Sequence, residues 1–266
     1  MNSLLASLGA RLAEYLSQPR RQGTQVATAT PQLLANALRP GDVLLVEGNS
    51  RISSAIKYLT QSTWSHAALY VGDALGPPKP GAKPATLIEA DIRDGVRAVA
   101  LSVYDGMHTR ICRPVGLAPG DLKKVIDYAI SRIGHQYDLK NVFDLARYLV
   151  PTPPVPVRWR RRMIAFGSGD PSRAICSTLI AQAYQSVHYP ILPEVTRVKS
   201  DDPACRDCYR ETLQIRHYSL YTPRDFDISP YFAVVKPTLL HAFDYRRVSW
   251  AHDAPGNAET MVAIAA

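Results

Sequence analysis

One cysteine in this sequence stands where a nucleophile would be expected. Cys176 lies at the start of the apolar run 175–184, directly after the loop-like segment 167–171. Apolar residues recur in this run at roughly helical spacing, which predicts a buried helix with the cysteine in its first turn. The unpaired N–H groups and the positive dipole end of a helix start favour thiolate, the nucleophilic form, over thiol. Cys176 is therefore a candidate nucleophile; the alternative is a free cysteine that only fills the core.

A nucleophilic thiol needs a base within hydrogen-bond reach and a third group that orients the base. His66 lies in the segment 63–73, whose alternation predicts a strand. Glu89 lies in a second predicted strand, 86–90, and the single connecting loop favours an antiparallel pair that brings Glu89 near His66. The alternatives are a hydrogen-bonded core histidine and a charge on an edge strand.

These three residues predict a nucleophile, a base and an orienting carboxylate. His66 would take the thiol proton of Cys176 and return it to the leaving group, while Glu89 would hold the ring and stabilise imidazolium. The backbone N–H of Cys176 would contribute to an oxyanion hole, which typically carries about 3 kcal/mol per donor.

The elements that must position these residues follow from periodicity. Besides 63–73 and 86–90, strands are predicted at 43–46, 96–101, 109–113 and 231–235, and the four strands from 63–73 to 109–113 are expected to form a meander. Helices are predicted at 33–38, 50–60, 121–133 and 140–149. We therefore expect an α+β fold with one antiparallel sheet packed against the helix that bears the cysteine.

Composition narrows the class of protein. The chain has 266 residues, of which 46% are hydrophobic and 20% charged, values typical of a globular protein. Its four cysteines are too few for a disulfide framework. The first residues lack the basic and long apolar regions of a signal peptide, and no apolar run approaches the ~18 residues of a spanning helix. We expect a cytoplasmic protein, with peripheral membrane contact as a further option.

The net charge of +8 favours anionic partners. Part of it lies in the segment 150–171, whose repeated prolines exclude a regular helix at its start. Trp159 is surrounded there by four arginines, Arg158, Arg160, Arg161 and Arg162. This composition predicts contact with an anionic membrane surface, and a solvated basic loop is the alternative. Aromatic residues are too sparse elsewhere for a nucleic-acid groove, so no nucleic acid is expected.

A lone CxxC, Cys205 and Cys208, is the other cysteine pattern. A structural zinc site needs four ligands, and His217 is the only nearby nitrogen candidate. We therefore expect no metal and no cofactor, and the role of the pair stays open.

Four segments in this order resemble the circularly permuted members of the NlpC/P60 papain-like superfamily. They are Pro40-Gly-Asp-Val43, Ser65-His-Ala-Ala-Leu-Tyr-Val-Gly72, Leu87-Ile-Glu-Ala90 and Ile175-Cys-Ser-Thr-Leu179. In unpermuted members the cysteine helix precedes the histidine strand, whereas here Cys176 follows His66 by 110 residues. The match covers roughly residues 39–236. It is closest to the YiiX/YaeF-like group of cysteine amidases, with lecithin:retinol acyltransferase-type enzymes as more distant relatives.

The resemblance implies a permuted papain-like fold with Cys176 as nucleophile, His66 as base and Glu89 as the third polar residue. Gly134-His-Gln-Tyr-Asp138 is similar to the family's Gly-x-x-Tyr segment, which implies that Tyr137 assists the oxyanion site. The cysteine is followed by Ser177-Thr178 rather than by the Ser-Gly common in cell-wall peptidases. That departure argues against a peptidoglycan substrate.

The predicted organisation has three parts. Residues 1–38 form an amphipathic helix and a linker, 39–250 the catalytic domain with the basic insertion 150–171, and 251–266 a loose tail. We expect a cysteine hydrolase that cleaves an amide or ester through a thioester acyl-enzyme, acting on an acyl lipid or an N-acylated small molecule. The alternatives are a peptidoglycan peptide amidase and a non-catalytic membrane-surface binding protein on the same fold.

Overall fold

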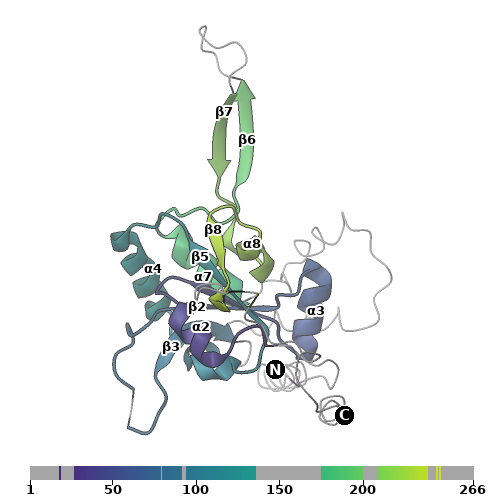
Figure 1. The fold of residues 1–266 in the computed structure, drawn as a ribbon. Helices are drawn as coiled ribbons and strands as arrows, with labels where there is room; N and C mark the ends of the chain where they lie inside the picture. Colours follow the sequence, from purple (N-terminus) through teal and green to yellow (C-terminus); the bar gives the residue numbers. More distant parts are fainter. Residues whose placement is uncertain are drawn as a thin grey trace, which may run out of the picture.

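A six-stranded antiparallel sheet forms the centre of the fold (Figure 1). A computed structural model describes residues 18, 27–78, 80–91, 94–135, 175–199, 209–238, 244 and 246. The order of the strands is β4-β3-β2-β1-β5-β8, and every neighbouring pair is antiparallel. Their bounds are β1 (Val43–Val46), β2 (His66–Tyr70), β3 (Ala85–Asp91), β4 (Gly95–Ala100), β5 (Thr109–Pro114) and β8 (Phe232–Val235). The expected α+β class with an antiparallel sheet is confirmed.

Helices lie on both faces of this sheet. They are α2 (Pro31–Ala37), α3 (Arg51–Thr60), α4 (Pro119–Ser131), α7 (Ile175–Gln185) and α8 (Pro223–Asp227), with short 3-10 turns η1 (Leu101–Tyr104) and η3 (Tyr218–Leu220). The helices predicted at 33–38, 50–60 and 121–133 are confirmed with ends shifted by up to two residues. Ser50 caps α3 as its sequence type predicts, because its side chain accepts the N–H of Ser53.

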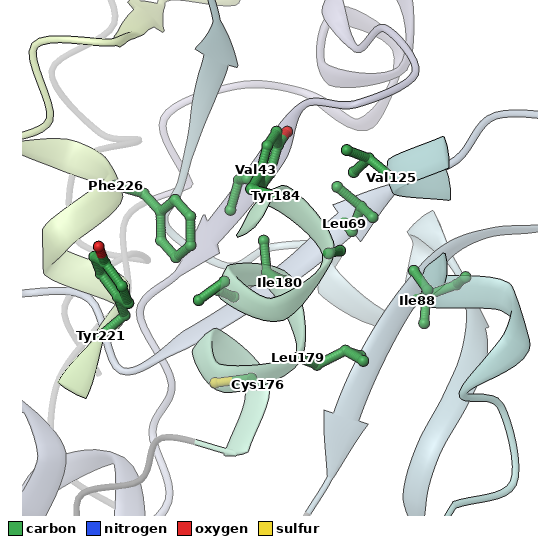
Figure 2. Packing of buried hydrophobic residues seen from close by; sticks show 14 of the residues in the cluster. Val43, Leu69, Ile88, Val125, Cys176, Leu179, Ile180, Tyr184, Tyr221 and Phe226 are labelled. Atoms are coloured by element: carbon green, nitrogen blue, oxygen red, sulfur yellow. The ribbon is translucent and has the colours of Figure 1, made fainter. Parts of the chain in front are cut away.

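Two apolar clusters lie between the helices and the two faces of the sheet. The α7-side core joins α7 and α4 to one face of the sheet, and it includes the fully buried Leu69, Ile88, Leu179 and Ile180 (Figure 2). The α2-side core lies on the opposite face, where α2 and η1 cover Val46, Ala68 and Leu87. Fully burying one aliphatic side chain contributes about 1.5–3 kcal/mol, so α7 is held mainly by its apolar face.

The expected meander is wrong for β5. Strands β1 to β4 are neighbours in chain order, but β5 leaves β4 and returns to pair with β1. The physical reason lies in β1, whose four residues are all buried. A strand buried on both faces cannot serve as an edge without exposing its backbone groups, so β1 needs a neighbour on each side. The register of β5, with Cys112 opposite Val43, supplies that neighbour.

A separate two-stranded hairpin was not predicted. Strands β6 (Glu194–Lys199) and β7 (Tyr209–Gln214) pair with each other and project away from the main sheet (Figure 1). Val195 lies opposite Leu213, and both side chains are about half exposed. Because the exposed apolar residues do not follow one buried face, the alternation that identifies half-buried strands is weak here.

The turn before β1 connects the sheet to α7. Gly41 has a left-handed φ of +89°, and a Cβ atom there would lie 2.5 Å from Leu122 Cδ1. The buried hydroxyl of Tyr184, on α7, donates a hydrogen bond to the Gly41 carbonyl. A glycine is therefore required both by its backbone conformation and by the close approach of α4.

Several predicted segments lie outside the described residues. They are most of the N-terminal segment 1–26, the helix at 140–149, the basic insertion 150–171 and the tail 251–266. Among the helices that the structure does describe, none is long and apolar enough to cross a membrane.

Candidate active site

His66 opens β2 and faces the α2 side of the sheet. It is in register with Val46, and it shares a strand face with Ala68, because alternate residues of a strand point to the same side. Val46 and Ala68 both belong to the α2-side core. The His66 side chain is 23% exposed, so the ring stays within reach of solvent at the end of the strand.

Cys176 reaches the same point from the opposite side. Strands β2 and β3 pair from Tyr70–Leu87 to Ala68–Glu89, and this pairing does not continue to His66. The N–H of Val71 is donated to the Thr86 carbonyl, and alternate N–H groups along an extended strand point to the same side, so the N–H of Ala67 also points toward the β3 side. The N–H of Ala67 is donated instead to the Cys176 sulfur. The sulfur therefore lies where β2 and β3 separate, and it also hydrogen-bonds with His66.

Glu89 is held by donors from three elements. It lies opposite Ala68 on β3 and is 3% exposed. Its Oε2 is 2.5 Å from His66 Nε2 and accepts the Tyr104 hydroxyl, also at 2.5 Å. Its Oε1 accepts a hydrogen bond from Arg97 Nε at 2.9 Å, and Arg97 Nη2 forms an ion pair with the same oxygen at 2.8 Å. Because Nε2 of His66 faces Glu89, Nδ1 is the ring nitrogen left for the sulfur of Cys176.

The pKa values of Cys176, His66 and Glu89 are shifted in directions that favour the charged form of each group. Burial alone would raise the pKa of Cys176, but the His66 imidazolium and the N–H groups of Ala67 and Ser177 lower it below the ordinary value. Burial opposes a charged His66, yet Cys176 and Glu89 raise the pKa of this histidine to about 10. Despite its burial, hydrogen bonds from His66, Tyr104 and Arg97 lower the pKa of Glu89 to about 2. Thiolate, imidazolium and carboxylate thus coexist near neutral pH.

Polar contacts also fix the residues that precede His66. Trp64 is 2% exposed, its Nε1 donates to Asp227 at 3.0 Å, and Arg110 lies over its ring at 4.9 Å. The Ser65 hydroxyl accepts the Gly48 N–H at 2.8 Å. A histidine on so constrained a segment keeps a defined ring position, which acid–base chemistry requires.

The structure brings together three of the four predicted catalytic residues: Cys176, His66 and Glu89. Tyr137 lies outside the described residues, as do Trp159, Arg158, Arg160, Arg161 and Arg162 of the predicted membrane contact. Cys205 and Cys208 also lie outside them. Within the part of the chain that the structure describes, no group of three His, Cys, Asp or Glu side chains could hold a metal ion.

Two residues at the site were not predicted, Arg97 and Tyr104. Arg97 lies directly opposite Glu89 in the β3–β4 pair, so the opposite charges of two adjacent predicted strands were a usable signal. Tyr104 belongs to the short turn η1, and its sequence neighbourhood carries no pattern that predicts contact with Glu89.

Comparison with known proteins gives distant structural likenesses. No family model matches the chain, and no curated protein matches it either. Among solved structures, it is similar to the crystal structure described as metalloprotein yiiX from Escherichia coli O157:H7, DUF1105. The sequence identity is 17%, the TM-score is 0.43, and the match covers 75% of this chain and 97% of that chain.

Proposed function

We propose that this protein is a cysteine hydrolase that cleaves an amide or ester through a thioester acyl-enzyme. Cys176 is the nucleophile, His66 the general base and acid, and Glu89 the carboxylate that orients the ring. The observation that carries the proposal is the hydrogen-bonded row of Cys176, His66 and Glu89, in which a buried thiol has a lowered pKa. Lowered thiol pKa beside an imidazolium is the usual means of activating a cysteine nucleophile.

Acylation begins from the thiolate. The Cys176 sulfur attacks the carbonyl carbon, a C–S bond forms, and the carbonyl electron pair moves to oxygen. When this intermediate collapses, the bond to the amine or alcohol breaks and His66 gives its proton to the leaving group. Glu89 stabilises the imidazolium before that transfer, so the ring holds the proton until the leaving group takes it.

Deacylation uses the same residues in reverse. Neutral His66 takes a proton from water, and the resulting hydroxide attacks the thioester carbonyl. The C–S bond then breaks, which releases the acid and restores the Cys176 thiolate beside imidazolium. The backbone N–H of Cys176 at the start of α7 is suited to stabilise the oxyanion in both halves, and the predicted contribution of Tyr137 is part of the same proposal.

The substrate class we favour is an acyl lipid or an N-acylated small molecule. Its support is the composition of the segment around Trp159, where four arginines suit an anionic lipid surface, together with the absence of the Ser-Gly that follows the cysteine in cell-wall peptidases. Hydrolysis and acyl transfer to another acceptor both pass through the thioester, so a substrate screen should measure the free acid and the transfer product.

The decisive test compares the wild-type protein with Cys176→Ala across phospholipids, N-acyl amino acids and muropeptides. We expect release of an acyl group from a lipid or N-acyl substrate by the wild-type protein only, with a thioester on Cys176 trapped by acid quenching and located by mass spectrometry. Turnover confined to muropeptides would replace the lipid substrate with a peptidoglycan one.

A second outcome would overturn the enzyme itself. If no substrate is turned over and iodoacetamide labels Cys176 no faster than an ordinary thiol, the row of charges does not activate the sulfur. Anionic vesicles that retain the protein under those conditions, and that release it after charge reversal at 160–162, would identify a membrane-surface binding protein instead.

A further inference from the structure

The carboxylate at the site is more strongly held than orientation of one imidazole requires. Glu89 has two oxygens, and donors on three different elements occupy them: His66 on β2, Arg97 on β4 and Tyr104 on η1. A carboxyl group that is 3% exposed and lacks such donors would be neutral at ordinary pH. Hydrogen bonds from Tyr104 and Arg97 therefore add to the larger effect of His66 in keeping Glu89 charged.

We propose that Arg97 and Tyr104 are positioning residues that keep Glu89 ionised and aimed at His66, and that they thereby extend the pH range in which Cys176 is a thiolate. This inference rests on the proposed function, because it assigns the machinery behind the same three residues. Both residues hydrogen-bond Glu89 and not the Cys176 sulfur, so we assign their effect on the sulfur to Glu89.

Arg97 supplies the charge. It lies opposite Glu89 in the β3–β4 register, its Nε donates to Glu89 Oε1, and its Nη2 forms an ion pair with the same oxygen; a lysine would keep the charge but not the planar guanidinium. Asp94 accepts a bond from the far side of the guanidinium, and Asp91 adds to the negative charge around it. Arg97 is thus held from both sides and cannot easily leave Glu89.

Tyr104 orients the Glu89 carboxylate toward His66. Its side chain is 5% exposed in the α2-side core, and its hydroxyl donates to the same oxygen that faces His66. Burial and the neighbouring Glu89 raise the pKa of Tyr104 well above its ordinary value, so the hydroxyl keeps its proton and remains a donor. The tyrosine oxygen is also 3.4 Å from His66 Nε2, which places it beside the shared bond.

The consequence for pH follows from the charges that face Glu89. These are His66 from β2, Arg97 from β4, the Tyr104 hydroxyl from η1 and, beyond His66, Cys176 from α7. Without Arg97 the buried carboxyl takes up a proton at higher pH. A neutral Glu89 no longer stabilises imidazolium, and without imidazolium the pKa of the Cys176 thiol rises. Cys176 is then no longer a thiolate at the acidic end of its former pH range.

The test is the pH dependence of Cys176 alkylation by iodoacetamide, followed by mass spectrometry, because it needs no substrate. In wild-type protein the rate should fall only in acid. Arg97→Met should move the midpoint of this fall upward by about one pH unit or more, Arg97→Lys by less, and Tyr104→Phe by about half a unit. A merely structural role would lower stability without moving the midpoint.

Two matched control variants distinguish a positioning role from a merely structural one. Arg197→Met removes another arginine that lies opposite a glutamate across two strands, the pair with Glu211 at 2.8 Å in the projecting hairpin. Tyr184→Phe removes another buried hydroxyl, the one bonded to Gly41. Both should leave the midpoint of Cys176 alkylation unchanged.

The outcomes are distinct for the two proposals. If wild-type Cys176 reacts only near the pKa of an ordinary thiol, the proposed function fails and this inference fails with it. If the wild-type midpoint is low but Arg97→Lys and Tyr104→Phe, both folded by cooperative urea unfolding, leave it unmoved, the inference alone is overturned. These two conservative variants keep the test decisive even if Arg97→Met does not fold.

Discussion

Two buried cysteines in this molecule have opposite acid–base properties. Cys112 on β5 is 0% exposed and Cys176 on α7 is 4% exposed, and both are free thiols. Burial raises the pKa of Cys112 far above its ordinary value, and Asp227 adds to the effect. The pKa of Cys176 is lowered although burial acts on it in the same direction. Burial therefore does not decide whether a thiol is reactive.

The difference lies in the donors that surround each sulfur. Cys112 is in the middle of a strand whose backbone groups pair with β1 and β8. Cys176 is at the start of a helix, where N–H groups lack partners within the helix, and it meets Ala67 N–H where β2 and β3 separate. His66 then supplies the positive charge. Cys112 is thus an internal reference for the site, a buried thiol whose pKa is raised.

The largest expected effect comes from removing that positive charge. In His66→Asn, Cys176 loses its imidazolium and should become more like Cys112, since only the N–H groups of Ala67 and Ser177 then oppose the effect of burial on its pKa. We expect alkylation of Cys176 at about pH 6 to slow by roughly a hundredfold or more, because the thiolate fraction falls tenfold for each rise of one in the pKa. Mass spectrometry of both cysteines in one sample measures it. A rate within about threefold of wild type would show that His66 does not activate the sulfur.

The next effect concerns stability in acid. The pKa of Glu89 is lowered from 4.5 to about 2, mainly by its bonds to His66, against the effect of burial. A lowered carboxyl pKa stabilises the folded state above the ordinary value, and this stabilisation is lost as pH falls from about 4.5 through about 2. The shift corresponds to about 3 kcal/mol at most. Urea unfolding at neutral and acid pH should show this loss in wild type and a smaller one in Glu89→Gln.

Asp42 provides the control for that experiment. It is 1% exposed and accepts two bonds from Arg113, yet burial outweighs them and raises its pKa. A raised carboxyl pKa has the opposite effect on stability as pH falls, because the folded state then takes up the proton more readily than the unfolded chain. An Asp42→Asn variant should therefore keep the acid sensitivity that Glu89→Gln reduces. Equal sensitivity in all three proteins would assign it to other groups.

Sequence predicted the parts of the fold and of the site that depend on local patterns. Helical periodicity was enough for α7 and placed Cys176 in its first turn, and strand alternation was enough to bring Glu89 near His66, because both patterns are local. The return of β5 to β1 was not predictable locally, since it depends on β1 being buried on both faces. Tyr104 was missed for a related reason: its contact with Glu89 joins a 3-10 turn to a strand, and no sequence period spans that distance.

The smallest expected effect is that of the reference cysteine itself. Cys112→Ala removes one buried sulfur from the α7-side core, beside β1, and should lower the free energy of unfolding by about 1–2 kcal/mol. The alkylation rate of Cys176 and its pH midpoint should not change, because Cys112 makes none of the contacts that lower the pKa of Cys176. Urea unfolding and the labelling assay measure the two quantities separately. A shifted midpoint would mean that the two thiols are coupled through β1, and the contrast between them would then no longer isolate the part played by His66.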